Sequence, residues 1–207
     1  MTKLFKSPLS SDQQDALKEI MNIGAGHAAT ALSQMLKKPV RINVPSVAWA
    51  QVEKAGDVFG AQEQVVSTVY LRLLGDLTGV ILFSFSKDQA RRLAALLLNE
   101  GAKPRPVLSE IAQSALKETA NIRSGAYLGA LTKFLKLKLL ISTPGFAEDM
   151  AGAVVDGILI ETSQNAQSLL AIETELTIAG EKIQAYFFFV PDTASFVKVL
   201  EVMGVQR

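Results

Sequence analysis

One stretch of 37 residues occurs twice in this chain, and the repeat constrains the fold more than any other feature of the sequence. Residues 9–45 align without a gap with residues 108–144, at an offset of 99. After a proline that ends both copies, the halves align again through two runs of alternating apolar residues to a final amphipathic run. Self-similarity of this kind indicates one structural unit that is built twice.

Both copies show the same order of predicted elements. A Ser before an amphipathic run predicts a helix over about residues 12–37 and another over about residues 110–136. A short strand follows each helix, and we expect it to end at the repeated proline, Pro45 or Pro144. Two alternating runs then predict a β-hairpin, and the last amphipathic run predicts a closing helix.

This order predicts an α+β fold of two pseudo-symmetric repeats that share a largely antiparallel sheet covered by helices. The repeats span about residues 9–101 and 108–204, and Gly and Pro residues near 99–107 predict the joint between them. Each repeat is close to the lower size limit of a stable domain. We therefore expect residues 1–207 to form a single domain.

The composition narrows the classes of function. The 21 Lys and Arg against 20 Asp and Glu give a net charge of +1, which argues against binding to nucleic acid. The absence of Cys and the single His argue against a thiolate or multi-histidine metal site, so we expect no metal or cofactor of its own. The N-terminus has no apolar signal core, and no run approaches the roughly 20 apolar residues of a membrane span. We expect a cytoplasmic protein without direct membrane insertion.

The first copy places a polar group on the solvent side of its predicted helix. On a helical wheel, Asp15, Glu19, Asn22 and Gly26 lie within about 60° of each other, opposite the apolar residues. The second copy places Ser114, Glu118, Asn121 and Gly125 at the same angles. An exposed polar group is usually just a solvated surface. Its recurrence at matching positions favours a function, because an exposed Asn has no packing reason to recur.

A Glu and an Asn together suggest a limited chemistry. The carboxylate can pair with a cation on a partner, and the carboxamide offers one donor group and one acceptor. Neither side chain is a convincing nucleophile, but a carboxamide can orient a water molecule for in-line attack on phosphorus. The sequence has no phosphate-binding Gly-rich loop, so phosphate and metal would arrive on a partner protein. Mid-helix Gly26 and Gly125 would leave clearance for that partner.

The repeated spacing is also familiar as a family pattern. The two copies read Asp15-x3-Glu19-x2-Asn22-x22-Pro45 and Ser114-x3-Glu118-x2-Asn121-x22-Pro144. This pattern resembles the signature of the CheC/CheX/FliY family of bacterial and archaeal chemotaxis phosphatases, over essentially the whole chain. The resemblance implies hydrolysis of the aspartyl-phosphate of the response regulator CheY. It further implies that Glu19 and Glu118 pair with a regulator Lys, while Asn22 and Asn121 orient the attacking water.

The same resemblance implies that phosphorylated CheY supplies both the phospho-aspartate and a bound Mg²⁺. Asp15 and Ser114 match a variable position of the family pattern, where we expect a supporting role. Pro45 and Pro144 are expected to shape the exit of the strand. The copies differ where Gly24 of the first becomes Arg123 of the second, on the apolar side of the helix, which predicts a buried ion pair or an altered helix contact. We expect both sites to be competent.

A second partner is implied by the resemblance, the receptor deamidase CheD. Its receptor substrates carry Gln/Glu pairs flanked by small residues on helices. Residues 145–157 have this character and predict a short helix, in which Glu148 and Asp149 would occupy the deamidase site with Phe146 nearby. We expect a monomer or a heterodimer with CheD.

Two other functions stay open at this point. The chain could be a non-catalytic adaptor that sequesters CheY or CheD with the same exposed faces. It could also be a structural component of the flagellar switch, which the missing FliY switch domain disfavours. Intact Glu and Asn in both copies favour catalysis over an adaptor, because sequestration does not require a carboxamide at that position.

Overall fold

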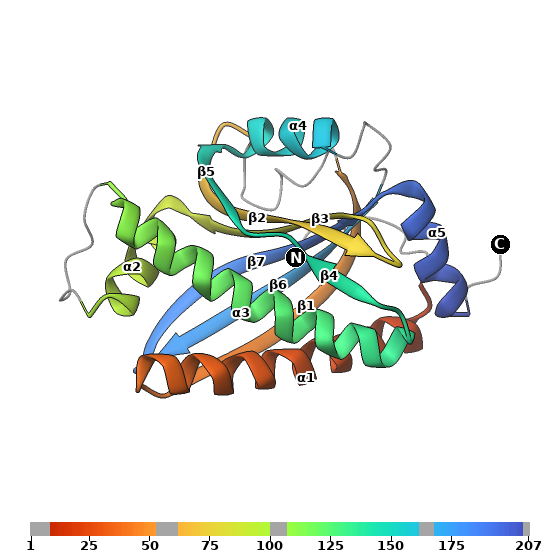
Figure 1. The fold of residues 1–207 in the computed structure, drawn as a ribbon, viewed down its shortest axis with the longest axis horizontal. Coiled ribbons are helices and arrows are strands. Elements are labelled where there is room, and N and C mark those ends of the chain that lie inside the picture. Colours follow the sequence, from red (N-terminus) through yellow and green to blue (C-terminus); the bar gives the residue numbers. More distant parts are fainter. Residues whose placement is uncertain (1–8, 53–61, 100–106, 162–167, 205–207) are drawn as a thin grey trace.

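The computed structural model describes residues 9–52, 62–99, 107–161 and 168–204 (Figure 1). Each repeat begins with a long helix, continues through strands and ends in a shorter helix. In chain order the elements are α1 (Ser11–Leu36), β1 (Val40–Gln51), β2 (Val65–Gly75), β3 (Gly79–Ser86), α2 (Lys87–Leu97), α3 (Glu110–Leu135), β4 (Leu139–Ile141), β5 (Gly145–Met150), α4 (Ala151–Glu161), β6 (Ser168–Ile178), β7 (Glu181–Pro191) and α5 (Thr193–Val202).

The two long helices begin and end by the same local devices. At the start of α1 the Ser10 hydroxyl accepts a hydrogen bond from the backbone N–H of Gln13, and Ser109 does the same at the start of α3. At the other end, Lys37 and Lys136 take up the left-handed conformation, with φ of 52° and 55°. The predicted bounds of both helices are confirmed to within one residue.

All seven described strands form one antiparallel sheet in the order β1-β6-β7-β3-β2-β4, with β5 also paired to β2. The central pair, β3 and β7, joins the two halves. Outside this pair, β1 of the first half pairs with β6 of the second half. In turn, β4 and β5 of the second half pair with β2 of the first half. The predicted α+β fold of two pseudo-symmetric repeats sharing one sheet is confirmed, and its halves are interleaved.

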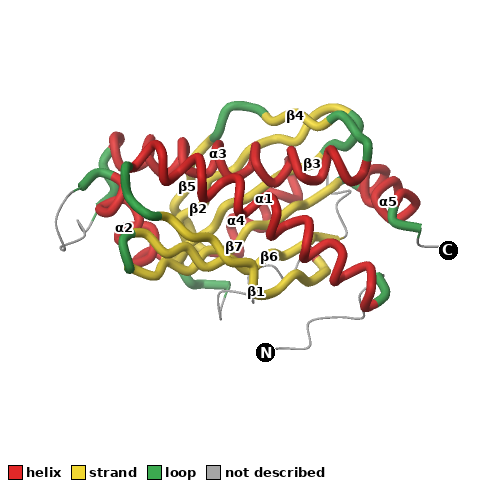
Figure 2. Tube along the Cα trace, turned by 90° about the horizontal axis from the view of Figure 1, so that it is seen from below, coloured by secondary structure: helices red, strands yellow, loops and turns green. Residues whose placement is uncertain are grey.

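The two faces of the sheet are covered differently. The long helices α1 and α3 lie side by side on one face, whereas α4 lies on the opposite face (Figures 1 and 2). The main core fills the space under the long helices, and aromatic rings contact each other at its centre. Tyr127 of α3 packs edge-on against Phe187 of β7 with ring centroids 4.9 Å apart, and Phe83 of β3 lies 5.7 Å from Phe187. Alternation along each strand separates this core from the smaller one under α4.

The predicted end of the first strand at Pro45 is wrong. β1 continues through Pro45 to Gln51, and its register against β6 shifts between Asn43 and Ser46. Proline lacks the N–H that a strand ladder needs, and a bulge on an edge strand is a place where this absence is tolerated. Pro144 of the second copy does follow the end of its strand, since β4 stops at Ile141.

The predicted short helix over residues 145–157 is wrong in its first part. Residues 145–150 form the strand β5, and the helix α4 begins only at Ala151. The cause is tertiary. This segment pairs along its whole length with the edge of β2 that is not paired with β3, from Val65 with Met150 to Tyr70 with Gly145. Helical periodicity in the Ala- and Gly-rich sequence could not reveal that partner.

Candidate functional site

The polar residues that the repeat singled out lie on the outer faces of α1 and α3, as predicted. On α1, Asp15, Glu19 and Gly26 are exposed and Asn22 is half-buried. On α3 the equivalent residues have the same burial, with Ser114, Glu118 and Gly125 exposed and Asn121 half-buried. The two helices therefore present two copies of one polar surface.

Open space lies beside each Asn. A Cβ atom built on Gly26 or on Gly125 would meet none of the described residues within 4 Å, apart from the nearby backbone of its own helix. Neither glycine is therefore required by packing within this chain. Each lies one helical turn beyond its Asn, where a side chain would project toward an approaching partner.

The carboxamide of Asn22 is held by two hydrogen bonds. Its Nδ2 donates to the carbonyl of Lys18 on the preceding turn at 3.0 Å. Its Oδ1 accepts from the backbone N–H of Val44 on β1 at 3.3 Å. Asn22 therefore joins α1 to the edge of the sheet, a role that the sequence did not suggest.

The carboxamide of Asn121 has no such partner within the described residues. The reason is the different strand that follows α3. β4 stops at Ile141, and Thr143, which is equivalent to Val44, lies between β4 and β5. The two sites thus share their residues and their exposure but differ in how firmly the Asn is held.

Arg123 is fully buried at 0% exposure and has no carboxylate partner among the described residues. Its Nη2 donates to the Tyr127 hydroxyl at 3.2 Å, and its guanidinium lies 3.8 Å from the centroid of the Phe83 ring. Burial lowers the pKa of Arg123. Of the two alternatives that the sequence left open, the structure shows an altered contact and no ion pair in the part of the chain that it describes.

Phe146, Glu148 and Asp149 do not lie on a helix. On the strand β5, Phe146 packs against the main core, and Glu148 faces the same side of the sheet. Glu148 pairs with Arg91 of α2 at 3.1 Å and accepts a hydrogen bond from Ser67 at 2.8 Å. Partial burial alone would raise the pKa of Glu148, but Ser67 and Arg91 outweigh it and hold that pKa below its ordinary value. The Glu148 carboxylate is therefore already engaged within this chain.

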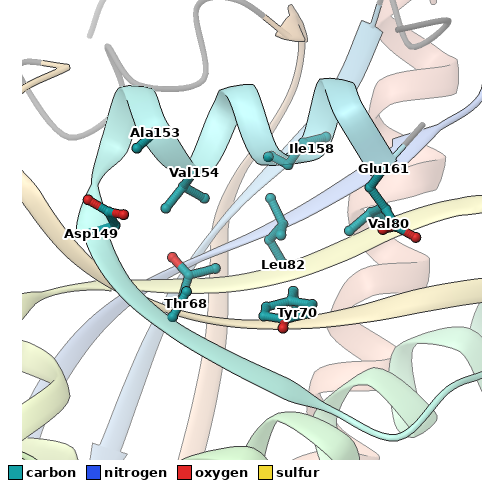
Figure 3. A pocket seen from close by; sticks show the side chains of 11 residues that line it. Thr68, Tyr70, Val80, Leu82, Asp149, Ala153, Val154, Ile158 and Glu161 are labelled. Atoms are coloured by element: carbon teal, nitrogen blue, oxygen red, sulfur yellow. The ribbon is translucent and has the colours of Figure 1, made fainter. Parts of the chain in front are cut away.

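Asp149 points to the other side of the sheet, at one end of a groove beneath α4 (Figure 3). The groove has a volume of about 280 Å³ and runs between α4 and the strands β2 and β3. Its walls are mainly apolar, with Tyr70 and Val154 among them, and Glu161 lies at the opposite end from Asp149 (Figure 3). Alternation along β5 thus separates two neighbouring acids that the sequence analysis had treated as one pair.

Sequence reasoning missed a second contact between α1 and β1, which Ser33 makes. Ser33 of α1 donates to and accepts from the backbone of Val40, at 3.4 and 3.0 Å, and so contacts the same strand as Asn22. Residues 22, 26, 29 and 33 follow one face of α1, so the helical wheel places Ser33 on the same face as Asn22, three turns further along the helix. The contact with the β1 backbone depends on the tertiary structure, and no sequence signal marks it.

The described residues provide neither a candidate metal site nor a candidate membrane span. No group of three or more His, Cys, Asp and Glu side chains there could hold a metal ion. None of the helices among them is long and apolar enough to cross a membrane.

Comparison with known proteins matches both copies of the site. A model of the CheC-like family matches residues 13–48 and 111–148, which contain Glu19, Asn22, Glu118 and Asn121. The chain is 34% identical over 200 residues to the CheY-P phosphatase CheC of Bacillus subtilis (strain 168), covering 95% of this chain and 96% of that protein. It is 31% identical over 137 residues to the flagellar motor switch phosphatase FliY of the same strain, covering 66% of this chain and 35% of that protein.

The fold has a counterpart among solved structures. The crystal structure of Thermotoga maritima FliY superimposes with a TM-score of 0.73 at 23% sequence identity, covering 96% of this chain and 99% of that chain. At this identity the match concerns the fold alone. The family model, the 34% identity to a CheC protein over nearly the full length of both chains, and the shared fold together show that this chain belongs to the CheC-like family.

Proposed function

We propose that this protein hydrolyses the aspartyl-phosphate of the response regulator CheY. One observation carries the proposal: an exposed Glu and a half-buried Asn, with open space beyond, occur at equivalent places on α1 and α3. The similarity to a CheY-P phosphatase over nearly the whole chain supports the substrate.

The two side chains would divide the work as follows. Glu19 or Glu118 pairs with a Lys beside the phospho-aspartate and fixes the docked regulator. Asn22 or Asn121 holds a water molecule in line with the scissile bond. The water oxygen forms a bond to phosphorus while the bond from phosphorus to the aspartyl oxygen breaks, which gives inorganic phosphate and a free Asp. Mg²⁺ held by the regulator, not by this chain, would neutralise charge on the phosphoryl oxygens.

The proposal is tested by the decay of phosphorylated CheY with catalytic amounts of this protein. The wild type should accelerate decay, and the double variant Asn22→Ala/Asn121→Ala should lose about a hundredfold of the acceleration, because the water is no longer positioned. Gln34→Ala/Lys133→Ala is a matched control, since these exposed residues occupy equivalent places on the same two helices. Equal loss in both double variants would contradict the assignment.

The single variants separate the sites. We propose that both are competent, so Asn22→Ala and Asn121→Ala should each retain part of the acceleration. Thermal unfolding must accompany the assay, because Asn22→Ala also removes the acceptor of the Val44 N–H. Binding of phosphorylated CheY without any acceleration by the wild type would instead identify an adaptor.

We also propose that the protein binds the deamidase CheD, as a heterodimer, and is otherwise a monomer. Of the three residues first considered, Asp149 is the one whose carboxylate faces an open groove, while Phe146 and Glu148 are engaged in the fold. Asp149→Lys should weaken CheD binding in a calorimetric titration. Asp12→Lys, on the helix that covers the opposite face, is the control. Unchanged affinity in Asp149→Lys would rule out this surface.

A further inference from the structure

The strand β1 is an outer edge of the sheet, and part of its backbone has no partner. The backbone N–H of Ala179 donates to the carbonyl of Pro39, which makes Val40 and Ile178 a pair without mutual hydrogen bonds. Alternation then places Ile42 and Leu176 in the same kind of pair. The N–H and C=O groups of Val40 and Ile42 therefore point away from β6, toward the free edge.

The helix α1 runs beside this free edge and covers it at two points. Ser33 bonds to the backbone of Val40, and the carboxamide of Asn22 accepts from the N–H of Val44. Ile42 lies between these two points. Among the described residues, no group bonds to its backbone N–H or C=O.

A groove lies at this uncovered part of the edge. It is lined by Ala29 of α1, by residues 40–43 of β1, and by Glu175 and Thr177 of β6. On the α1 side, the helix face that carries Asn22 and Ser33 has small residues between them, Gly26 and Ala29. The backbone donor and acceptor of Ile42 therefore face open space two residues from Val44, whose N–H is bonded to the candidate catalytic Asn22.

The second copy differs at the positions that line this groove. The residue equivalent to Ala29 is Leu128, which is 5% exposed and packs in the main core. The strand equivalent to the first part of β1 is β4, which ends at Ile141. The residues at this place thus differ between the two sites.

We propose that an extended main-chain segment of the phosphorylated response regulator pairs with β1 at Ile42 when Asn22 meets the phospho-aspartate. The inference rests on the proposed function and deepens it. The position of the groove identifies its occupant. The backbone nitrogen of Val44 lies 3.3 Å from Oδ1 of Asn22, so a protein whose acyl phosphate reaches Asn22 also lies over the adjacent groove. The chemistry of the groove supports the same occupant. The backbone N–H and C=O of Ile42, which have no partner among the described residues, can bond to the backbone of an added strand.

This pairing would also release Asn22. The bond from the Val44 N–H to Asn22 is 3.3 Å long, beyond the usual 2.9–3.0 Å of such bonds. An added strand continues the ladder to Val44 and replaces the carboxamide as the acceptor of that N–H. The carboxamide oxygen is then available to the attacking water.

The first test removes the donor of Ile42. Ile42→Pro is made in the Asn121→Ala background, so that only the first site can act. Because Ile42 does not bond to β6, the sheet keeps its ladder, and a Pro is tolerated at such an edge position. We expect about a tenfold loss in kcat/KM for phosphorylated CheY, the effect of one or two lost hydrogen bonds.

Ile141→Pro in the same background is the matched control. Ile141 is the equivalent residue of β4, and its N–H also points away from the neighbouring strand, because the bond from the Ser142 N–H to the Arg72 carbonyl sets the same register. This control should keep the activity of its background. Unchanged kcat/KM in Ile42→Pro, or an equal loss in both variants, would overturn the inference.

A second measurement uses the unaltered protein, so it does not depend on the folding of a variant. Amide hydrogen exchange is followed at single-residue resolution with and without CheY activated by beryllofluoride. We expect the Ile42 amide to become at least tenfold more protected in the complex. Protection of α1 around Asn22 without protection of Ile42 would overturn the inference alone, whereas failure of the wild type to accelerate decay would overturn the proposed function.

Discussion

Gly24 and Arg123 occupy equivalent positions of the two long helices, and Gly24 lies where α1 contacts Tyr127 of α3. One turn further, Ala28 of α1 is equivalent to Tyr127 of α3. A Cβ on Gly24 would lie 2.7 Å from Cδ1 of Tyr127, so the large residues of α3 fill space that the small residues of α1 leave. Arg123 is accommodated without an acid because the Phe83 ring stacks on its guanidinium.

This contact predicts opposite effects for two Gly to Ala substitutions on one helix. Gly24→Ala should lower the free energy of unfolding by about 1–3 kcal/mol, because the Cβ would overlap both the ring and the backbone of Tyr127. Gly26→Ala should raise it by about 0.5–1 kcal/mol, because its Cβ meets open space and Ala is the better helix former. Urea unfolding of both variants measures the difference.

Gly26→Ala also tests the site itself. If Gly26 leaves clearance for the regulator, this variant should be more stable and yet slower in the decay assay. A variant that is more stable and equally active would remove Gly26 from the supporting residues.

At the level of elements, two carboxylates attach peripheral helices to the sheet. Glu148 joins β5 to α2 through Arg91, and its neighbour Ser67 lies on β2. Asp192 begins α5, where its carboxylate accepts from the Thr78 hydroxyl and the Ser195 N–H. Partial burial raises the pKa of Asp192, but these hydrogen bonds outweigh it and hold that pKa below its ordinary value.

These depressed pKa values predict how stability depends on pH. A carboxylate whose pKa is lower in the folded state stabilises the fold above its ordinary pKa of about 4, and this contribution is lost as the pH falls through the folded value. Glu148→Gln should therefore have a lower Tm than the wild type at pH 7. The gap should narrow as the pH falls from about 4 toward 2. A gap that stays constant over this range would show that the ionised form of Glu148 does not stabilise the fold.

For the whole molecule, the exchange of first strands makes the halves interdependent. β1 of the first half needs β6 of the second, and β5 of the second needs β2 of the first. A separated half would expose the edge of its hairpin together with the apolar face that the other half covers. We therefore expect the two repeats to unfold as one cooperative unit around the central pair of β3 and β7.

This interdependence predicts the behaviour of fragments. Residues 1–103 and residues 104–207, made separately, should each lack a cooperative thermal transition, because each loses its strand partners and half of the core. Mixed in equal amounts, they should regain one transition and the near-ultraviolet circular dichroism of the intact chain. A sharp transition in either fragment alone would show that a repeat folds by itself.

Much of this protein follows from the sequence by itself, where the signal is local or repeated. The Ser caps and the 3.6-residue period predict α1 and α3, and the repeat predicts the pseudo-symmetric sheet and the exposed Glu and Asn pairs. These inferences hold because capping and amphipathicity depend on residues within a few turns of each other.

The tertiary structure alone decided which strands meet, and through them what each side chain contacts. Pairing with β2 makes residues 145–150 a strand, which turns Glu148 and Asp149 to opposite faces. Because β1 runs beside α1, Asn22 has a backbone partner that Asn121 lacks among the described residues. The same arrangement leaves the backbone N–H and C=O of Ile42 without a partner among those residues. Such contacts join residues that are distant in the chain, and neither propensity nor period carries information about a partner of that kind.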